Sequence, residues 1–328
     1  MTEISVVLPF FQDNPSLFRE CLESVRAQTF PDWECLLIGD GPSPETLAVA
    51  HEFAFRDPRF CVHVKEHAGI VSALNRGLSL AEGSYIARMD ADDTAHPDRL
   101  SIQLDLAHRE RRKILVGARV RIRGGMSRFQ HWVDQITSEE LVRAEAYIDC
   151  AYPHPTWFAQ KRDFLDLGGY LHGDIPEDYD LFMRMVGEGW HFSRSEEQLV
   201  TMTHHPDRLT LRDRRYRPEA FRECKWSALR AFFSNGTPIL IAGGGRTARW
   251  WLKRLQEHEV KVLGLLDIRP SRIGKKILGV PVLEYDALDL GGDVRYLVAV
   301  PRWEQRQEIR SHFRAAGRRE GVDYVCVT

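Results

Sequence analysis

Short β-rich runs alternate with helical patterns along the first 110 residues of this 328-residue chain. Such alternation is typical of a parallel sheet flanked by helices, because a crossover between parallel strands is usually helical. Strands are expected at residues 4–10, 34–39, 60–65 and 84–89. The carboxyl ends of parallel strands form a ligand crevice, so the following residues should converge on one site: Pro9, Asp40 and Asp90.

The chain between residues 66 and 205 carries further helix and strand patterns. Ile70, Leu74, Leu78 and Ala81 repeat at helical spacing, and Gly83 follows as the expected stop. Beyond residue 110 the pattern is less regular, with three expected elements: a strand at 114–122, a polar helix near 138–146 and an amphipathic helix after residue 177. These patterns predict an α/β fold.

Three carboxylates follow the apolar strand expected at 84–89, namely Asp90, Asp92 and Asp93. Adjacent carboxylates repel one another unless a positive group lies between them. One interpretation is a solvated turn, where polar side chains face water. The other is a site for a divalent cation, because hard cations prefer oxygen ligands.

A second acidic pair, Glu177 and Asp178, precedes the amphipathic helix. Leu181, Phe182 and Met185 have the spacing that places apolar side chains on one helical face, toward a core. Acidic residues in a first helical turn stabilise the helix dipole, so a purely structural role is one interpretation of the pair. A catalytic role depends on which other groups the fold brings beside it.

The composition excludes several classes of protein. The net charge of −2 gives no basic excess for binding nucleic acid or an anionic membrane non-specifically. Six cysteines without a C-x-x-C pair fit reduced thiols in a cytoplasmic protein. No apolar run approaches the roughly 18 residues that span a bilayer. We therefore expect no transmembrane segment and a cytoplasmic location, at most peripheral to the inner face of the membrane.

Six segments, in order, resemble the GT-A type glycosyltransferases of family 2, which use nucleotide-sugar donors. They are "VVLPFFQDNP", "WECLLIGDG", "ALNRGLSLAEGSYIARMDADDTAHPDRL", "PHPTWF", "LGGY" and "PEDYDLFMRM". The resemblance covers about residues 3–210 and implies a GT-A fold, Mn²⁺ or Mg²⁺ as cofactor and transfer with inversion. The chain lacks the Q-x-x-R-W segment and membrane helices of the processive synthases, so transfer of one sugar at a time is expected. Synthesis of a surface polysaccharide or another glycan is the implied role.

The resemblance also implies roles for the acidic residues. Asp90 would lie near the nucleoside ribose, while Asp92 and Asp93 would hold the metal ion against the donor diphosphate. Asp178 would act as general base on the acceptor hydroxyl, a contribution typically worth about 10² to 10⁴ in rate. Glu177 would help to orient the acceptor.

A histidine and an arginine near residue 205 are further candidates. His205 would be another metal ligand, with His204 as the competing choice, and a loop histidine without a ligand remains an alternative. Arg208 would pair with phosphate oxygens, for which the forked guanidinium is suited. These assignments complete the expected metal and diphosphate site.

The donor-binding residues include one departure from the family pattern. Many relatives have two aspartates after the second strand, the first reading uracil, whereas this chain has Gly39 and then Asp40. Either Asp40 contacts the nucleobase or backbone groups read it, and a turn role for Asp40 is equally open. A UDP-sugar stays the favoured donor, with a glycan or lipid-linked acceptor. Other residues that the resemblance places at the donor are Pro9, Phe10, Asn75 and Arg76.

The remaining chain predicts a second domain. Three parts are expected: a GT-A domain at 1–210, a linker and helix at 211–235, and a Rossmann-like domain at 236–328. The last part resembles the small domain at the front of some sugar acetyltransferases. Its candidate ligand residues are Gly243, Gly245, Arg246 and Asp267. Binding of NAD(P) or a nucleotide sugar, a sensor function, and glycines serving only tight strand-to-helix packing are the alternatives.

Overall fold

The computed structural model describes residues 2–110, 112–124, 128–205, 208–285 and 293–328. The chain forms two compact units. The first comprises Met1–Val142 and Cys150–Cys224, and the second comprises Arg143–Asp149 and Lys225–Thr328. Both units are mixed α/β structures, as the alternating sequence pattern predicts.

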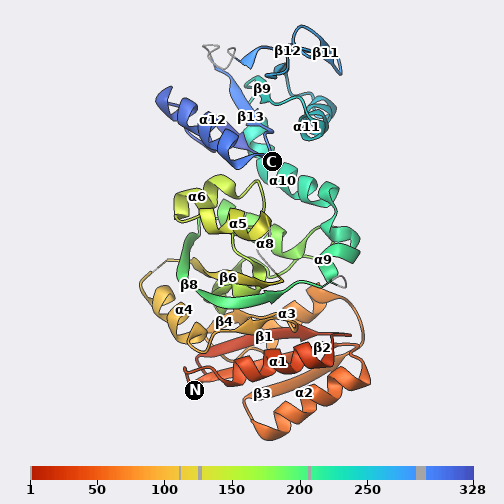
Figure 1. Cartoon of the computed structure of the whole chain (residues 1–328), viewed down its shortest axis with the longest axis vertical. Coiled ribbons are helices and arrows are strands. Elements are labelled where there is room, and N and C mark those ends of the chain that lie inside the picture. Colours follow the sequence, from red (N-terminus) through yellow and green to blue (C-terminus); the bar gives the residue numbers. More distant parts are fainter. Residues whose placement is uncertain (1, 111, 125–127, 206–207, 286–292) are drawn as a thin grey trace. The chain divides into compact units, whose positions relative to one another are not determined.

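The first unit contains an eight-stranded sheet in the order β3-β2-β1-β4-β7-β6-β8-β5 (Figure 1). The strands are β1 (Ile4–Phe10), β2 (Trp33–Asp40), β3 (Phe60–Lys65), β4 (Tyr85–Arg88), β5 (Thr94–Ala95), β6 (Ile114–Arg123), β7 (Phe158–Gln160) and β8 (His191–Thr203). Strands β3, β2, β1 and β4 are parallel, and β7 pairs antiparallel with β4. The carboxyl ends of β1, β2 and β4 therefore share one edge.

Helices and short 3-10 turns connect these strands. They are α1 (Pro15–Arg26), α2 (Pro44–Arg56), α3 (Ile70–Leu80), α4 (Arg99–His108), α5 (Arg128–Gln135), α6 (Glu139–Glu145), η1 (His154–Thr156), α7 (Lys161–Asp166), α8 (Glu177–Gly187), α9 (Leu209–Arg212), η2 (Arg214–Tyr216) and α10 (Pro218–Phe233). Helix α1 begins where Asn14 accepts hydrogen bonds from the backbone N–H groups of Ser16 and Leu17. Pro15 supplies a preset φ at the first helical position.

The expected elements of the first unit are confirmed within two residues at each end. The strands expected at 4–10 and 60–65 are β1 and β3, and the helix expected at 70–81 is α3. Gly83 has a role beyond stopping that helix. A Cβ on Gly83 would lie 2.6 Å from the backbone nitrogen of Ser5, so the chain passes too close to β1 for any side chain.

The main core of the first unit lies between β1, β2 and β4 on one side and α1, α2 and α4 on the other. All seven residues of β1 are buried, as in a central parallel strand covered on both faces. Phe18 of α1 and Phe53 of α2 are among the largest fully buried side chains. Each such side chain contributes roughly 1.5–3 kcal/mol by burial, which keeps the strand ends in fixed positions.

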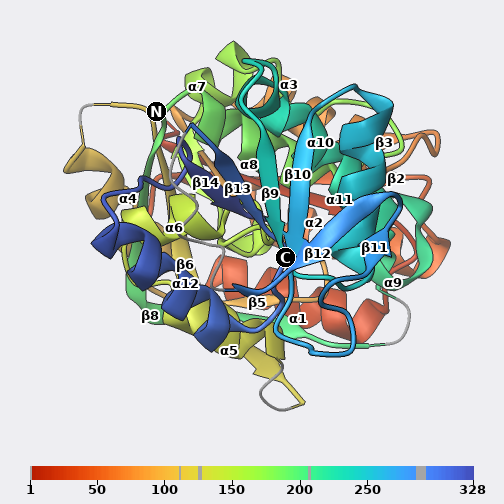
Figure 2. The same ribbon diagram turned by 90° about the horizontal axis from the view of Figure 1, so that it is seen from above.

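The second unit contains a sheet in the order β11-β12-β10-β9-β13-β14. Figure 2 shows β9, β10 and β13 side by side, and all three are parallel. Its elements are β9 (Ile239–Ala242), α11 (Arg246–Glu257), β10 (Val262–Leu266), β11 (Lys276–Ile277), β12 (Val280–Leu283), β13 (Arg295–Val298), α12 (Trp303–Ala315) and β14 (Tyr324–Cys326). The predicted order of strand, glycine turn, helix and strand is thus confirmed as β9, α11 and β10. No helix in the described part of the chain is long and apolar enough to cross a membrane.

Candidate active site

The three carboxylates after β4 form one cluster. One oxygen from each of Asp90, Asp92 and Asp93 lies within 4.8 Å of the others. The backbone N–H of Thr203 donates a 2.8 Å hydrogen bond to Asp93 Oδ1, whereas Asp93 Oδ2 is buried with no partner among the described residues. Burial, with Asp90 and Asp92 close by, raises the pKa of Asp93 well above its usual value. An unpaired buried oxygen is costly, so this cluster fits a hard divalent cation.

His205 lies beside the cluster, and its role as a metal ligand stays a prediction. Its Nε2 lies 2.8 Å from Asp92 Oδ2. Burial and the neighbouring Asp90 raise the pKa of Asp92, and His205 partly offsets the rise. Exposed His204 has a pKa lowered first by partial burial and then by Arg208 and His205.

Asp13 is a site residue that the sequence analysis missed. Burial raises its pKa to about 6, and the charges of Asp92 and Asp90 add to that rise although the Phe11 N–H opposes it. Asp13 lies just beyond the carboxyl end of β1, so the strand-end rule applied to Asp40 and Asp90 would have identified it.

Arg88 forms an ion pair with Asp90 of the cluster. Its Nη1 lies 2.5 Å from Asp90 Oδ1, and its side chain is buried. Burial alone would lower the pKa of the Arg88 guanidinium, but Asp90 outweighs burial and the pKa is raised. Arg99, also buried, donates to the Arg88 carbonyl at 2.7 Å and so fixes the backbone just before the cluster.

Glu177 and Asp178 open helix α8 with different surroundings. Glu177 is buried and accepts a 2.6 Å hydrogen bond from the Tyr216 hydroxyl. Asp178 is half-buried, and its Oδ1 accepts a hydrogen bond from the Tyr179 N–H at 2.7 Å. Asp178 is therefore the more accessible of the two carboxylates.

Tyr170 is a buried residue whose pKa is affected by both acidic groups. Its ring is buried, and its hydroxyl lies 2.8 Å from Nε2 of His154. Burial raises the pKa of Tyr170, and the charges of Glu177, Asp178 and Asp90 raise it further against the opposing effect of Arg88. The charges at the end of β4 and at the start of α8 thus both act on the Tyr170 phenol.

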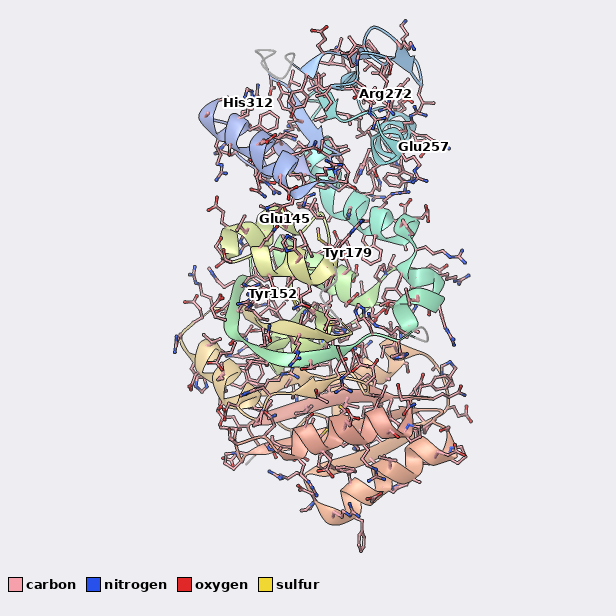
Figure 3. All side chains as sticks on the ribbon, in the orientation of Figure 1. Glu145, Tyr152, Tyr179, Glu257, Arg272 and His312 are labelled. Carbon is pink, nitrogen blue, oxygen red and sulfur yellow. The ribbon has the colours of Figure 1, made fainter. Side chains whose placement is uncertain are left out.

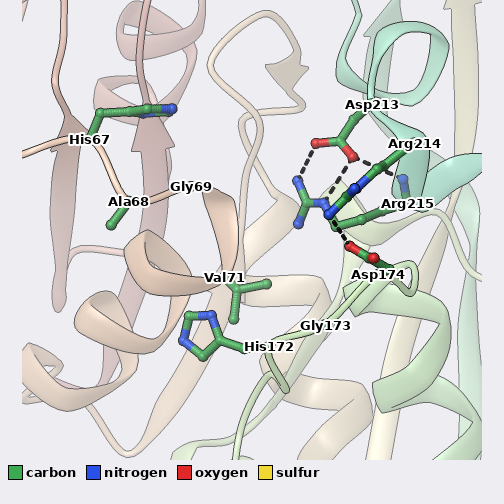
Figure 4. Close-up of a pocket in the computed structure, with 10 residues that line it drawn as sticks. All are labelled: His67, Ala68, Gly69, Val71, His172, Gly173, Asp174, Asp213, Arg214 and Arg215. Atoms are coloured by element: carbon green, nitrogen blue, oxygen red, sulfur yellow. Dashed lines mark hydrogen bonds and ion pairs between the residues drawn. The ribbon is translucent and has the colours of Figure 1, made fainter.

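A pocket with a cavity volume of about 330 Å³ opens in the first unit (Figure 4). Three segments line it: residues 67–69 with Val71, residues 172–174, and residues 213–215. None of the three clustered aspartates lines this pocket. Ala68 and Gly69, whose backbone N–H groups bind Asp40, do line it, and so does Arg215, which pairs with Glu177. The pocket therefore lies beside residues of both expected sites.

Both side-chain oxygens of Asp40 are bound by groups of the neighbouring loop at residues 65–69. Its oxygens accept hydrogen bonds from the backbone N–H groups of Ala68 and Gly69 at 2.9 and 2.8 Å, and Lys65 pairs with it. Burial alone would raise the pKa of Asp40, but Lys65 and the two N–H groups outweigh burial and lower it. His67 Nδ1 lies 2.8 Å from the same carboxylate. These contacts show that Asp40 binds the loop before α3.

The other expected donor residues have varied surroundings. Pro9 and Phe10 are buried at the end of β1, where the Phe10 ring stacks on Phe18 at 5.0 Å. Asn75 exchanges two hydrogen bonds with the backbone of Tyr170, at 2.8 and 2.9 Å. Arg76 is exposed on α3. Arg208, half-buried, is the N-cap residue of α9. Donor contact by these residues stays a prediction.

The glycine turn of the second unit lies between β9 and α11. Gly243 has a φ of +115°, and a Cβ there would lie 2.8 Å from the Ala299 carbonyl oxygen. Asp267 ends the next strand and forms a 2.7 Å ion pair with Arg272. Gly245 and Arg246, at the start of α11, are exposed. Close packing accounts for Gly243, and ligand binding at this turn stays a prediction.

Comparison with known structures identifies the fold. S. aureus TarS 1–349, in complex with UDP-GlcNAc, superimposes with a TM-score of 0.52 at 16% identity, over 71% of this chain and 67% of TarS. The mannosyltransferase PcManGT from Pyrobaculum calidifontis, in complex with GDP-Man and Mn²⁺, superimposes with a TM-score of 0.51 at 14% identity. The match covers 78% of this chain and 80% of PcManGT. The chain thus has the GT-A fold, as predicted, and carries an Asp-x-Asp type cluster at its strand ends.

Sequence comparison identifies the family. The model described as glycosyl transferase family 2 matches residues 5–168. An uncharacterized glycosyltransferase of Haemophilus influenzae is 30% identical over 199 residues, which cover 58% of this chain and 72% of that protein. The amylovoran biosynthesis glycosyltransferase AmsE of Erwinia amylovora is 29% identical over 191 residues, which cover 56% of this chain and 70% of AmsE. The chain belongs to glycosyl transferase family 2.

Proposed function

We propose that this protein is an inverting, metal-dependent glycosyltransferase that moves one sugar from a nucleotide-sugar donor to a hydroxyl group of an acceptor. One observation carries the proposal: three carboxylates, one of them Asp93 with a buried unpaired oxygen, lie together just beyond the carboxyl end of β4, and the Glu177–Asp178 pair lies in the same unit. A cation site and a candidate base must lie close together for a sugar to pass between a diphosphate and a hydroxyl.

Asp92, Asp93 and His205 would hold Mn²⁺ or Mg²⁺. The bound ion would stabilise the charge that develops on the departing nucleoside diphosphate. Arg88 fixes the orientation of Asp90, which would then be free to contact the ribose through its other oxygen. Arg208 would pair with the phosphate oxygens.

Asp178 would act as the general base. As the acceptor oxygen bonds to the anomeric carbon, Asp178 takes the hydroxyl proton. The bond from that carbon to the diphosphate oxygen breaks, and its electron pair leaves with the nucleoside diphosphate. A single displacement of this kind inverts the anomeric configuration. The half-buried position of Asp178 leaves it accessible to an acceptor.

A UDP-sugar is our favoured donor, although the two structural neighbours differ in their nucleotide, UDP-GlcNAc for TarS and GDP-Man for PcManGT. Asp40 would not read the base, because its oxygens bind the loop at residues 67–69. A thermal-shift screen of nucleotide sugars with and without Mn²⁺ tests the donor, since a ligand of the native state raises its stability.

The acceptor would be a glycan or a lipid-linked glycan, in surface polysaccharide synthesis. The name of AmsE, an amylovoran biosynthesis enzyme, supports that role. We also propose a cytoplasmic protein that associates peripherally with the inner face of the membrane. Two exposed leucines on α9, Leu209 and Leu211, support this association, and arginines precede and follow them.

The second unit is proposed to be a Rossmann-like domain related to the front domain of sugar acetyltransferases. The parallel strands β10, β9, β13 and β14 and the glycine turn support this relation. Its ligand would be a nucleotide or nucleotide sugar at Gly243, Gly245, Arg246 and Asp267.

The Asp178→Asn variant tests the proposed reaction. We expect donor affinity within a few fold of wild type, while turnover falls by about 10² to 10⁴ because the base is lost. Glu188→Gln, at the exposed far end of α8, is the matched control and should keep full turnover. Retained turnover in Asp178→Asn would remove this residue as the base.

A further inference from the structure

Both oxygens of Glu177 are occupied by one neighbouring segment. The Tyr216 hydroxyl donates to Oε1 at 2.6 Å, and Nη1 of Arg215 lies 3.4 Å from Oε2. Glu177 is 2% exposed, so its carboxylate has little access to an acceptor. A buried carboxylate persists when paired in this way, because leaving it unpaired is strongly unfavourable.

The segment Asp213–Tyr216 is itself ordered by local bonds. Asp213 Oδ1 accepts from the backbone N–H of Arg215 at 2.9 Å and from its Nε at 3.1 Å, and Oδ2 accepts from Nη2 at 2.8 Å. This two-pronged pairing holds the guanidinium in the orientation that reaches Glu177. Burial, then the charges of Glu177 and Asp178, raise the pKa of Tyr216 well above its usual value, so the hydroxyl stays a proton donor.

The same segment lines the pocket of the first unit. Figure 4 shows Asp213, Arg214 and Arg215 on one side of that pocket, with the Arg214–Asp174 ion pair beside them. That ion pair is exposed and therefore weak, whereas the bonds to Glu177 reach a buried carboxylate. The position of the pocket wall at residues 213–215 therefore depends mainly on the bonds to Glu177.

We infer that Glu177 anchors the segment Asp213–Tyr216, and that Tyr216 and Arg215 are positioning residues for Asp178 and for the wall of the pocket. Glu177 and Asp178 are consecutive residues at the start of α8, so displacement of the Glu177 carboxylate displaces Asp178 with it. A misplacement of about 1 Å can cost about 10² in rate. The effect on catalysis rests on the proposed function, whereas the anchoring contacts do not.

Trypsin digestion of the folded full-length chain tests the anchor without any activity. The segment offers cleavage sites after Arg212, Arg214 and Arg215, whereas the bond after Arg217 precedes Pro218 and resists trypsin. Tyr216→Phe removes only the hydroxyl that bonds Glu177, and Glu177→Gln removes the charge. We expect the initial cleavage rate in this segment to rise at least about tenfold in both variants, because local opening becomes more frequent.

The matched control is Tyr85→Phe, whose ring packs against Phe158 and His108 at a distance from α8 in the sequence. This control should be cleaved at the wild-type rate. Wild-type cleavage rates in Tyr216→Phe and Glu177→Gln would overturn the inference.

Kinetics separate positioning from direct contact with a substrate. In Tyr216→Phe we expect kcat to fall about 10- to 100-fold, with the donor KM within about threefold of wild type. A raised donor KM with unchanged kcat would contradict the positioning role. If the wild-type enzyme transfers no sugar from any donor, the proposed function fails, but the trypsin comparison still decides whether Glu177 anchors the segment.

Discussion

Asp40 shows how a carboxylate at a strand end can serve the loop beside it. Two backbone N–H groups and Lys65 bind its oxygens, and these bonds hold the turn that enters α3. We predict that Asp40→Asn lowers the free energy of unfolding by about 1–3 kcal/mol, the cost of losing a charged acceptor in a buried site. Urea denaturation at pH 7 measures this change, with Asp105→Asn on α4 as an exposed control.

The difference between wild type and Asp40→Asn should depend on pH. The folded-state pKa of Asp40 is lowered, so its stabilisation is complete above the unfolded value of about 3.9 and is lost as pH falls through the folded value. We therefore expect the stability difference between the two proteins to shrink steadily as the pH falls below about 3.9. A difference that stays constant from pH 7 to pH 3 would show that the charge of Asp40 is not what stabilises the loop.

Substitution of Asp92 tests the proposed cation site. We expect Asp92→Asn to abolish the rise in thermal stability that Mn²⁺ and UDP together produce, because one metal ligand loses its charge. The protein itself should not become less stable, since the repulsion from Asp90 and Asp93 is relieved. Asp105→Asn should respond to Mn²⁺ and UDP like the wild type. Unchanged nucleotide affinity in Asp92→Asn with Mn²⁺ would contradict the site.

Sequence reasoning identified which polar side chains lie at strand ends, but not their partners. Asp90, Asp92 and Asp93 lie together, and His205 lies 2.8 Å from Asp92. Asn75 was expected at the donor, yet its amide bonds the backbone of Tyr170, 95 residues later. Such partners are decided by loop geometry, and neither spacing nor residue type encodes that geometry.

At the scale of elements, the alternating pattern predicted β1 to β4 well because buried parallel strands have continuous apolar runs. The start of the linker and helix predicted at 211–235 forms η2, whose Tyr216 hydroxyl binds Glu177. Charge and proline content resemble those of a linker, and only the tertiary contact distinguishes the two. Short segments held by one buried carboxylate are therefore difficult to find from sequence.

The last turn of α6 is part of the second unit, and one buried carboxylate binds it to the rest of that unit. Glu145, labelled in Figure 3, is fully buried, and its Oε2 accepts from Nη2 of Arg306 at 2.8 Å. Arg310 pairs with its other oxygen. Both arginines are also buried, with 2% of each exposed.

We predict that Glu145→Ala lowers the free energy of unfolding of the second unit by about 3–5 kcal/mol, because buried Arg306 loses its carboxylate partner and Arg310 keeps only Glu320. Glu140→Ala, exposed on the same helix, should change it by less than about 0.5 kcal/mol. Hydrogen exchange of the amides in β13 and β14 measures the stability of this unit separately. Equal protection in both variants would show that the arginines find other partners.

The whole molecule is not divided at a single point of the chain. Residues 143–149 belong to the second unit, although the chain returns to the first unit for residues 150–224. Tyr147 and Ile148 pack against the apolar clusters of the second unit, and Lys225 donates to the Ile148 carbonyl. The predicted boundaries at residues 210 and 236 place this segment in the GT-A domain.

Truncation tests how far the first unit is independent. A protein of residues 1–224 leaves Tyr147 and Ile148 without their apolar partners, so we expect it to fold but to aggregate, as exposed apolar patches do. Tyr147→Ser with Ile148→Ser in the same truncated protein should restore a monomer by size-exclusion chromatography. That monomer should keep its thermal stabilisation by Mn²⁺ with UDP, because the residues of the proposed site all lie in the first unit. An unfolded product with either sequence would show that the first unit needs residues 225–328 to fold.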